Sequence, residues 1–463
     1  MPQPIKKATS TPRADRHEAH GTIAPMIPMR PARFGALLLS TALLIAACGP
    51  TAVSPSPGPS GSAAPSPTAA APTATATPAA SATPLPRGAA ALVYDAIEGQ
   101  VVDLRGLKPV DVARRTIDAA TLKSMNATSF DEDNPPEYVA GNDRLLKALG
   151  LIGADQSLKE LYLDLIDSQV AGFYRPDDKT LYVVSRSGTI DGADKITFAH
   201  EYDHALQDAN FPGVFDAQKA LLDRSDQALA RAAIYEGDAT LLMSQWALPN
   251  LTPAELQDVV AAGSDPASRA VLERTPQALV EGLLFPYNAG LAFIAPIQSS
   301  GGWAAVDDVF EDLPRSTEQI LHPKKYDARE APLEVSFPAH AVDGLGGGWS
   351  VALQDTYGEF QISTWLREAG VSASDAADAA AGWGGDRLAV LDGPGDHWAV
   401  AIHTVWDSAA DAAEFEAAAT QAARRAGGSA EVLPGNGGTT RWFVVADDDA
   451  TRAAVAGALG LAG

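Results

Sequence analysis

The chain of 463 residues contains one cysteine, Cys48, so no disulfide can form within it. Histidine is also scarce, with 8 residues, and 34 Lys and Arg are outnumbered by 58 Asp and Glu, for a formal net charge of −24. No cluster of Lys and Arg is visible along the chain. Nucleic acids and anionic membrane surfaces bind clustered basic residues, so we expect no nucleic-acid partner.

The apolar run at residues 34–47 is too short to span a membrane comfortably. It follows a basic region and has the length of the apolar part of a signal peptide. It ends in Ile45, Ala46, Ala47 and Cys48, which resemble the lipobox of bacterial lipoproteins, where the cysteine is lipidated. A lone thiol in an exported protein has no partner within the chain, which favours lipidation of Cys48 over a free buried cysteine. We therefore expect residues 1–48 to be a signal peptide and the protein to be anchored to the outer face of the cell membrane.

Residues 49–87 are nearly all Pro, Ser, Thr, Ala and Gly. Such a segment cannot bury enough apolar surface to offset the entropy lost on folding, so it is predicted to be a disordered linker. Its prolines would keep it extended and hold the folded part away from the lipid surface. About 375 residues follow, enough for two or three domains by length.

The sequence His200-Glu201-Tyr202-Asp203-His204 is an H-E-x-x-H pattern. Residues four apart lie on one face of a helix, so His200 and His204 can bind one metal ion. Glu201 would lie beside that ion and could act as the general base for a water that the metal activates. This combination is the chemistry of a zinc hydrolase that cleaves amide bonds.

The alternative is an accidental pattern on a solvated helix. Because histidine is scarce, such a pattern would arise by chance on the order of once in a hundred chains of this composition. The flanking residues are also mostly apolar, which would leave two histidines and a glutamate poorly solvated without a partner. Both observations favour the metal site.

A catalytic zinc ion takes three ligands from the protein, so a third should lie downstream. Residues 227–248 predict one long helix, and Glu236 falls inside its apolar stripe. Burying a carboxylate there costs free energy unless a metal ion compensates its charge, so Glu236 is the candidate for the third ligand. The alternative is that Glu236 is an ordinary solvated glutamate. Gly237 suggests that another backbone or the substrate comes close. Asp238 is a candidate to accept a hydrogen bond from the free ring nitrogen of His200 or His204.

The motif HEYDH, followed by a glutamate on a later helix, resembles that of the gluzincin branch of zinc metallopeptidases, the thermolysin-like group. A closer resemblance is to a group of exported bacterial proteins with a metallopeptidase core. The segments that carry it are GFYRPDDKTLYVV, HEYDHALQD, IYEGDAT, LFPYNAG, GGW and STEQILHP. It covers residues 90–406.

The resemblance implies one Zn²⁺ ion with His200, His204 and Glu236 as ligands, and Glu201 as general base. It also implies a zincin-like core, a small mixed sheet with active-site helices, over residues 88–345. The thermolysin-like pattern has an aspartate four residues after the ligand glutamate, but here Thr240 stands at that position. A ligand histidine would therefore have to be oriented by Asp238 or another residue.

Two further residues are candidates for the opposite side of the zinc ion. Tyr287 lies in residues 283–297, which predict a buried helix, and its hydroxyl could donate to a developing oxyanion. His322 lies in or just past a short helix at 316–323, which opens with an S-x-x-Q capping box. It could stabilise the reacting carbonyl from the side opposite Glu201. For both residues the alternative is a packing role.

Other segments indicate the surroundings of this site. Residues 90–100 and 110–123 predict short helical and strand pieces, and 135–151 and 157–169 predict helices. Residues 170–185 predict a β-hairpin, in which 172–174 or 181–184 could bind the substrate backbone as an added strand, although both could equally be core. Residues 349–463 alternate between helix and strand patterns and predict a small C-terminal α+β domain with an antiparallel sheet.

The sequence as a whole therefore predicts an α+β protein, and its leading function is a lipid-anchored, extracytoplasmic zinc metallopeptidase acting on peptide or protein substrates. One alternative is a surface binding or scaffold lipoprotein whose metallopeptidase fold has lost turnover. Glu201 between intact histidines argues against it, since a binding protein needs no base. A hydrolase of non-protein amides such as cell-wall peptides is also open, and the sequence leaves the oligomeric state open.

Overall fold

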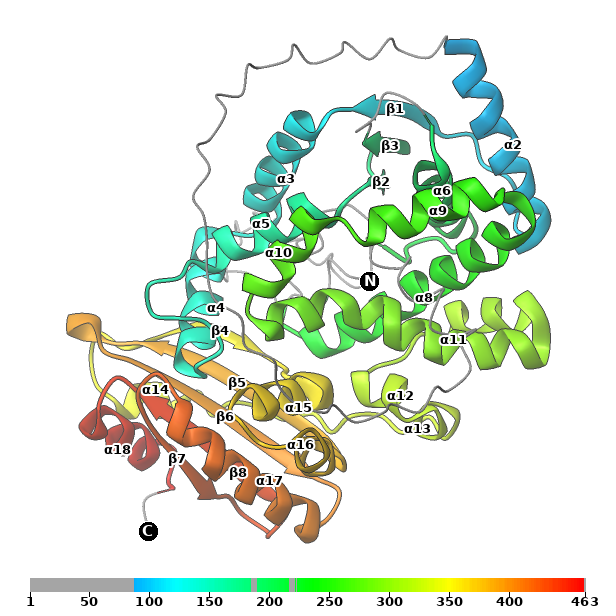
Figure 1. Ribbon diagram of the computed structural model, residues 1–463. Helices are drawn as coiled ribbons and strands as arrows, with labels where there is room; N and C mark the ends of the chain where they lie inside the picture. The colour runs from blue at the N-terminus through cyan, green and yellow to red at the C-terminus, as the bar shows by residue number, and fades with distance from the viewer. Residues whose placement is uncertain (1–86, 185–189, 216–220, 222, 462–463) are drawn as a thin grey trace, which may run out of the picture.

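The computed structural model describes residues 87–184, 190–215, 221 and 223–461, which form helices and two β-sheets (Figure 1). The mixture of helices and strands confirms the predicted α+β class. The predicted signal peptide, the lipobox with Cys48 and nearly all of the predicted linker lie outside the described residues.

The N-terminal part builds a three-stranded mixed sheet surrounded by helices, in the upper half of Figure 1. Its strand order is β1-β3-β2, with β3 parallel to β1 and antiparallel to β2. The strands are β1 (Ala113–Ile117), β2 (Gly172–Arg175) and β3 (Thr180–Val184). The helices of this part are α2 (Arg87–Arg105), α3 (Ala119–Asp133), α4 (Pro136–Ala148), α5 (Leu158–Gln169), α6 (Gly192–Asn210), α8 (Ser225–Asn250), α9 (Pro253–Gly263), α10 (Pro266–Arg274), α11 (Gln277–Glu311), α12 (Thr317–Leu321) and α13 (Pro323–Asp327).

The predicted hairpin is confirmed as β2 and β3, up to residue 184. Because β3 is paired on both sides, residues 181–184 have no free edge and cannot receive an added strand. That half of the substrate-platform prediction is wrong. Residues 172–174 of β2 lie at the edge of the sheet, so they keep the property that the prediction requires.

The other helix predictions have mixed outcomes. The helices expected at 135–151, 157–169 and 227–248 are confirmed as α4, α5 and α8, and the segment 283–297 lies inside the longer α11. The prediction of short pieces before residue 123 was incomplete, because 90–100 is part of the 19-residue helix α2 and 110–123 runs from β1 into α3. Ser157 caps α5 by accepting a hydrogen bond from the Glu160 backbone N–H, which is where a serine helps to start a helix.

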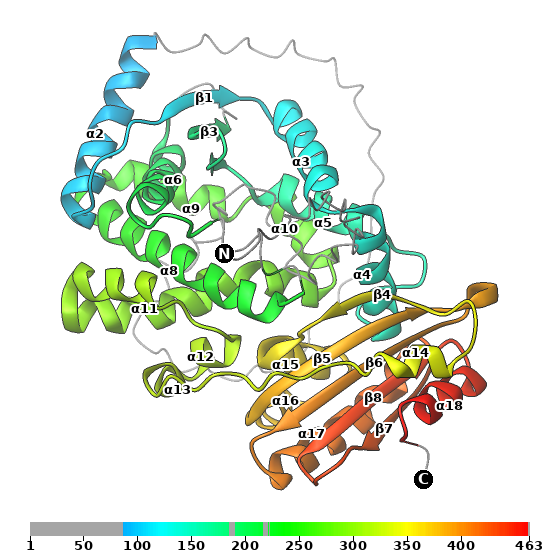
Figure 2. The same ribbon diagram turned by 180° about the vertical axis from the view of Figure 1, so that it is seen from behind.

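The C-terminal part is a five-stranded antiparallel sheet, which confirms the predicted sheet type. Its order is β4-β5-β6-β8-β7, and helices cover both faces (Figures 1 and 2). The strands are β4 (Ser350–Asp355), β5 (Trp383–Asp392), β6 (Trp398–Trp406), β7 (Ser429–Pro434) and β8 (Thr440–Ala446). The helices are α14 (His340–Gly344), α15 (Gly358–Glu368), α16 (Ala373–Ala380), α17 (Ala409–Ala422) and α18 (Asp449–Ala458).

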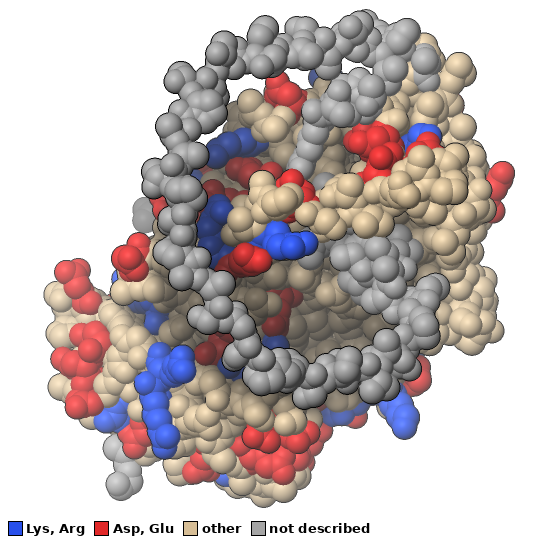
Figure 3. All heavy atoms as spheres, viewed as in Figure 1, with Lys and Arg blue, Asp and Glu red and all other residues tan. Residues whose placement is uncertain are grey.

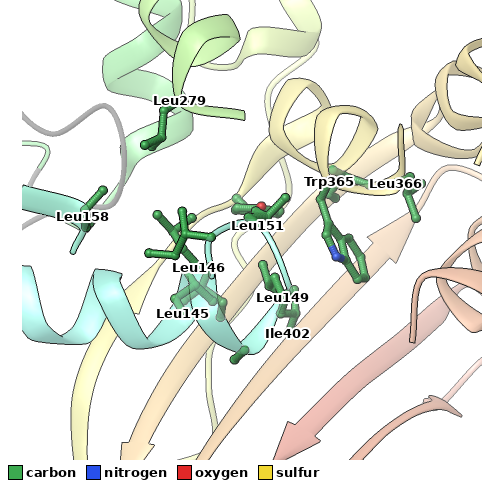
Figure 4. Packing of buried hydrophobic residues seen from close by; sticks show 14 of the residues in the cluster. Leu145, Leu146, Leu149, Leu151, Leu158, Leu279, Trp365, Leu366 and Ile402 are labelled. Carbon is green, nitrogen blue, oxygen red and sulfur yellow. The ribbon is translucent and has the colours of Figure 1, made fainter. Parts of the chain in front are cut away.

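One hydrophobic core extends across the predicted domain boundary at 345–349. Helix α4, from the N-terminal part, packs on β4, β5 and β6 of the C-terminal sheet. Figure 4 shows this junction, where leucines of α4 lie beside side chains of β6 and α15. The residues labelled there are Leu145, Leu146, Leu149, Leu151, Leu158, Leu279, Trp365, Leu366 and Ile402. The boundary itself stays a prediction, but the two parts share buried apolar surface and so stabilise each other.

Helix α11 is the described helix that is long and apolar enough, by length and composition, to cross a membrane. Half of its most apolar window is buried within the protein. Its main neighbour is α8, and Phe293 and Ile294 of α11 belong to a core cluster with α8 residues. A core helix shows this pattern as readily as a membrane span does.

Two glycines set how closely α8 and α11 approach each other. A Cβ atom added to Gly237 would lie 2.3 Å from the backbone carbon of Gly290, and one added to Gly290 would lie 2.0 Å from the Ala233 carbonyl oxygen. No side-chain movement can relieve an overlap with backbone. The expectation that a backbone comes close at Gly237 is therefore confirmed, and that backbone is α11.

We predict that Gly237→Ala and Gly290→Ala each lower the free energy of unfolding by about 1–3 kcal/mol or more, because the helices must separate. Urea unfolding of the full chain measures this. Gly457→Ala is the matched control, since a Cβ at that helical glycine meets nothing within 4 Å and alanine favours a helix by about 0.5–1 kcal/mol. Equal stabilities of Gly237→Ala and the parent would contradict the close packing.

Candidate metal centre

The H-E-x-x-H motif lies on α6, which begins at a capping box. The Asp191 carboxylate accepts from the Asp194 backbone N–H at 3.0 Å, and the Asp194 carboxylate accepts from the Asp191 N–H at 3.2 Å. These two bonds satisfy backbone donors that the first turn leaves free. The helix then runs through the core beside α8, so the motif residues are buried.

Glu236 of α8 faces both histidines of the motif. Its Oε2 atom lies 3.2 Å from His200 Nε2 and 3.3 Å from His204 Nε2. The ligand atoms of His200, Glu201 and His204 also lie within 4.8 Å of one another. The structure therefore brings together the four residues that the sequence predicts as ligands and base.

These distances and donors fit a bound metal ion. Two ligand atoms at about 2.0–2.1 Å from a zinc ion, in tetrahedral geometry, lie about 3.3 Å apart, which matches the spacing around Glu236 Oε2. His204 Nε2 is buried and has no hydrogen-bond partner of good geometry among the described residues. Two imidazoles and one carboxylate are a donor set that zinc accepts.

The pKa values show where charge is favoured among these side chains. Burial opposes ionisation of all of them, but the charge of Glu236 outweighs it at His204 and raises the pKa of that ring to about 10. Burial is likewise outweighed at Glu236, where His204 and His200 lower the pKa to about 2. At His200 burial prevails and lowers the pKa. The surrounding residues therefore favour a protonated His204 beside an ionised Glu236.

Glu201 is held by the edge strand β2. Its Oε2 atom accepts a hydrogen bond from the Tyr174 backbone N–H at 2.6 Å, whereas its buried Oε1 atom has no partner among the described residues. Burial raises the pKa of Glu201 to about 8, with Glu236 adding to the effect and His204 opposing it. One carboxylate oxygen is thus held by a hydrogen bond, and the other is available to accept a proton.

His204 is oriented by Gln207, which the sequence reasoning missed. His204 Nδ1 lies 2.9 Å from Gln207 Oε1, so a proton on Nδ1 would be donated to that amide oxygen. The Gln207 amide nitrogen in turn donates to Asp238 Oδ2 and to the Tyr235 carbonyl, both at 3.0 Å. The sequence could have predicted this contact, because Gln207 follows His204 by three residues and so lies on the same face of the helix.

The role predicted for Asp238 needs correction. Its carboxylate contacts neither motif histidine; it accepts from Gln207 and forms a buried ion pair with Arg105 of α2 at 3.1 Å. Arg105 also pairs with Asp307 at 2.6 Å, and its guanidinium lies over the Trp303 ring. Asp238 therefore acts on His204 only through Gln207. Arg105 precedes Asp238 by 133 residues, and no local pattern could have connected them.

Tyr287 of α11 lies against the site. Its ring stacks on His200 with centroids 6.1 Å apart. Burial, the charges of Glu236 and Glu201 and a hydrogen bond to Glu236 raise the pKa of Tyr287 well above its usual value, so the hydroxyl keeps its proton. The structure therefore brings Tyr287 to the predicted ligands.

His322 is not brought to the site. It lies between α12 and α13, and its Nε2 atom is 2.8 Å from Glu359 of α15, a contact that raises the pKa of His322. Its side chain is 44% exposed, and it shows no contact with the H-E-x-x-H residues in the described part of the chain. The catalytic role of His322 stays a prediction, and its described contact with Glu359 gives that role no support. Its capping box is half right, since Ser316 caps α12 but Gln319 accepts from the Arg315 N–H instead.

The comparisons with known proteins concern the C-terminal part. Residues 350–458 match the family model described as Domain of unknown function (DUF8575). No curated protein and no solved structure matches the chain. The matched residues span β4 to α18 and include none of the residues that face Glu236.

We predict that Gln207→Ala lowers the affinity for zinc by about 10–100-fold, because His204 loses the group that fixes its ring. Competition with a zinc-binding dye measures the affinity. Asn210→Ala, one turn further along α6, is the control and should bind zinc as the parent does, since the Asn210 side chain bonds to Leu206 and Lys108 within the described part of the chain. An unchanged affinity in Gln207→Ala would contradict the orienting role.

Proposed function

We propose that the protein is a zinc-dependent metallopeptidase with a zincin-like core, exported and anchored to the membrane by a lipid on Cys48. The observation that carries the proposal is the position of Glu236 Oε2, 3.2 and 3.3 Å from the two motif Nε2 atoms. Glu201 beside them adds a carboxylate with one free oxygen. The anchor rests on the sequence alone, and so does the resemblance to gluzincins.

His200, His204 and Glu236 would hold one Zn²⁺ ion. A zinc ion there would polarise a peptide carbonyl and lower the pKa of an attacking water. Two nitrogens and one oxygen suit zinc better than the all-oxygen sites of magnesium and calcium. Three protein ligands would also leave a coordination position open, as catalytic sites do and closed structural sites do not.

Glu201 is the residue that we propose as the general base. Its Oε2 atom is fixed by the Tyr174 N–H, so the position of the free Oε1 atom is also defined. Oε1 would take the proton of the attacking water and transfer it to the amine that leaves when the peptide bond breaks. A carboxylate held at one oxygen performs this transfer without first losing rotational freedom.

Tyr287 is the residue we assign to the substrate carbonyl. Because its raised pKa keeps the hydroxyl protonated, the side chain remains a hydrogen-bond donor at any physiological pH. It contacts Glu236 and His200, so in the proposed reaction it would lie near the carbonyl oxygen on which negative charge develops. A donor at that position would stabilise the transition state more than the bound substrate.

The edge strand β2 supports a peptide substrate over other amides. A peptide backbone can pair with a free strand edge, and β2 has β3 on one side only. The Tyr174 N–H on that free edge already reaches the Glu201 carboxylate, so a peptide along β2 would pass beside the base. A scaffold without turnover is the alternative, but it gives no reason for a free carboxylate oxygen beside the metal ligands.

We predict that Glu201→Gln cleaves a casein or peptide substrate at least 100-fold more slowly than the parent, because it removes the base. Its zinc content should stay near one ion per chain, since Glu201 is not assigned as a ligand. Metal analysis and cleavage assays of the full-length protein test this. Cleavage by Glu201→Gln at the parental rate would rule out the proposed chemistry.

We predict that Glu236→Ala loses most of its bound zinc and its activity, because the ion would keep only two protein ligands. Glu273→Ala is the control, since Glu273 is exposed on α10 and should change neither property. Zinc content after dialysis and the rise in thermal midpoint on zinc addition report binding without any turnover. Full zinc occupancy in Glu236→Ala would show that the third ligand is another residue.

A further inference from the structure

A pocket lies where the two parts of the protein meet. It has a volume of about 560 Å³ and is bounded by the start of α8, the segment 331–337 and strands β4 and β5. Ligand pockets of proteins have volumes of about 300–1,000 Å³, so a small organic molecule would fit. Its lining includes four arginines, Arg224, Arg231, Arg315 and Arg387.

Two of these arginines are neutralised by nearby carboxylates. Arg387 donates to the Asp223 carboxylate at 2.8 Å and to the Asp223 carbonyl at 2.8 Å. Arg224 lies 3.4 Å from the Glu334 carboxylate. These pairs explain half of the basic lining as ordinary structure.

The buried carboxylates of the pocket are also engaged, but with neutral donors. Asp226 accepts from the backbone N–H and hydroxyl of Thr317. Asp386 accepts from backbone and side-chain N–H groups, those of Tyr357, Gly358 and Trp383. Neither aspartate forms an ion pair with Arg231 or Arg315 in the described residues, although the charge of Arg387 lowers the pKa of Asp386.

Arg231 and Arg315 are left without a counter-charge. Neither forms an ion pair within the described part of the chain, and Arg231 Nε is buried with no hydrogen-bond partner there. Burial and the charge of Arg315 both lower the pKa of Arg231, which means that the two guanidinium groups repel each other. Two unneutralised arginines are unexpected in a chain of net charge −24, and Figure 3 shows acidic and basic side chains interspersed on the face that it draws.

We propose that this pocket binds a small organic ligand through an oxyanion group, a carboxylate or a phosphate, held between Arg231 and Arg315. The planar guanidinium fork matches the geometry of both groups and binds them through paired hydrogen bonds. A bound oxyanion would remove the repulsion between the two arginines and supply a partner for the buried Nε atom. The remaining volume and the side chains of Gln354 and Thr356 would accommodate the rest of the ligand.

This pocket is separate from the candidate metal centre. Arg231 precedes Glu236 by five residues on α8, and at 100° per residue the two side chains point about 140° apart. The pocket lining contains none of the residues assigned to the metal or to catalysis. The inference therefore stands whether or not the protein is a peptidase.

The test measures binding of inorganic phosphate and of succinate to the full-length protein by calorimetry and by the thermal unfolding midpoint, at constant ionic strength. We expect at least one anion to bind and raise the midpoint. Arg231→Gln and Arg315→Gln should each weaken that binding about tenfold or more, because each removes a charged hydrogen-bond donor. Whichever anion binds shows whether the ligand's oxyanion group is a phosphate or a carboxylate.

Arg274→Gln is the matched control, since Arg274 is exposed on α10 and pairs with Asp164 away from the pocket. It should bind the anion as the parent does. Arg315→Gln decides the matter if Arg231→Gln does not fold, because Arg315 is exposed. Absence of binding of both anions to the parent, or equal binding to the parent and the Arg315→Gln protein, would overturn the proposal.

Discussion

The arrangement of α6 and α8 depends on the contact of one carboxylate with two imidazoles in the buried core. Glu236, His200 and His204 are almost completely buried, and moving an ionised group out of water costs several kcal/mol even after relaxation. The raised pKa of His204 and the lowered pKa of Glu236 describe an ion pair between these two side chains, whereas burial lowers the pKa of His200 and favours its neutral form. A divalent cation would satisfy all three, and its binding energy would then contribute to folding.

The close approach of α8 and α11 adds Tyr287 to the same cluster. Gly237 follows Glu236 directly, and Gly290 follows Tyr287 by three residues, about one helical turn. Because backbone meets backbone at the two glycines, α11 lies near enough for the Tyr287 ring to stack on His200. The loss of helix propensity at two glycines is the cost of that approach. A side chain at either position would move Tyr287 away from the site.

Sequence reasoning succeeded where a periodicity or a short spacing carried the information. The i, i+4 histidines and the glutamate in an apolar helical stripe predicted a cluster that the structure assembles. It failed where the partner is distant in sequence: Asp238 pairs with Arg105 and His322 with Glu359, contacts that tertiary packing alone decides. The core shared by the two parts could not be predicted either. The sequence of α4 has the pattern of an ordinary amphipathic helix, and that pattern would be the same whichever sheet the helix covers.

The C-terminal sheet contributes to the candidate site although it carries none of its residues. Asp355, at the end of β4, accepts from the Ser225 backbone N–H at 2.8 Å and from its hydroxyl, which fixes the first residue of α8. Ser225 precedes Glu236 by eleven residues, about three turns of the same rigid helix. A change in the position of β4 would therefore be transmitted along α8 to Glu236. The part that matches a domain of unknown function thus helps to position the candidate metal ligands, and its removal would expose the leucines of α4 as well.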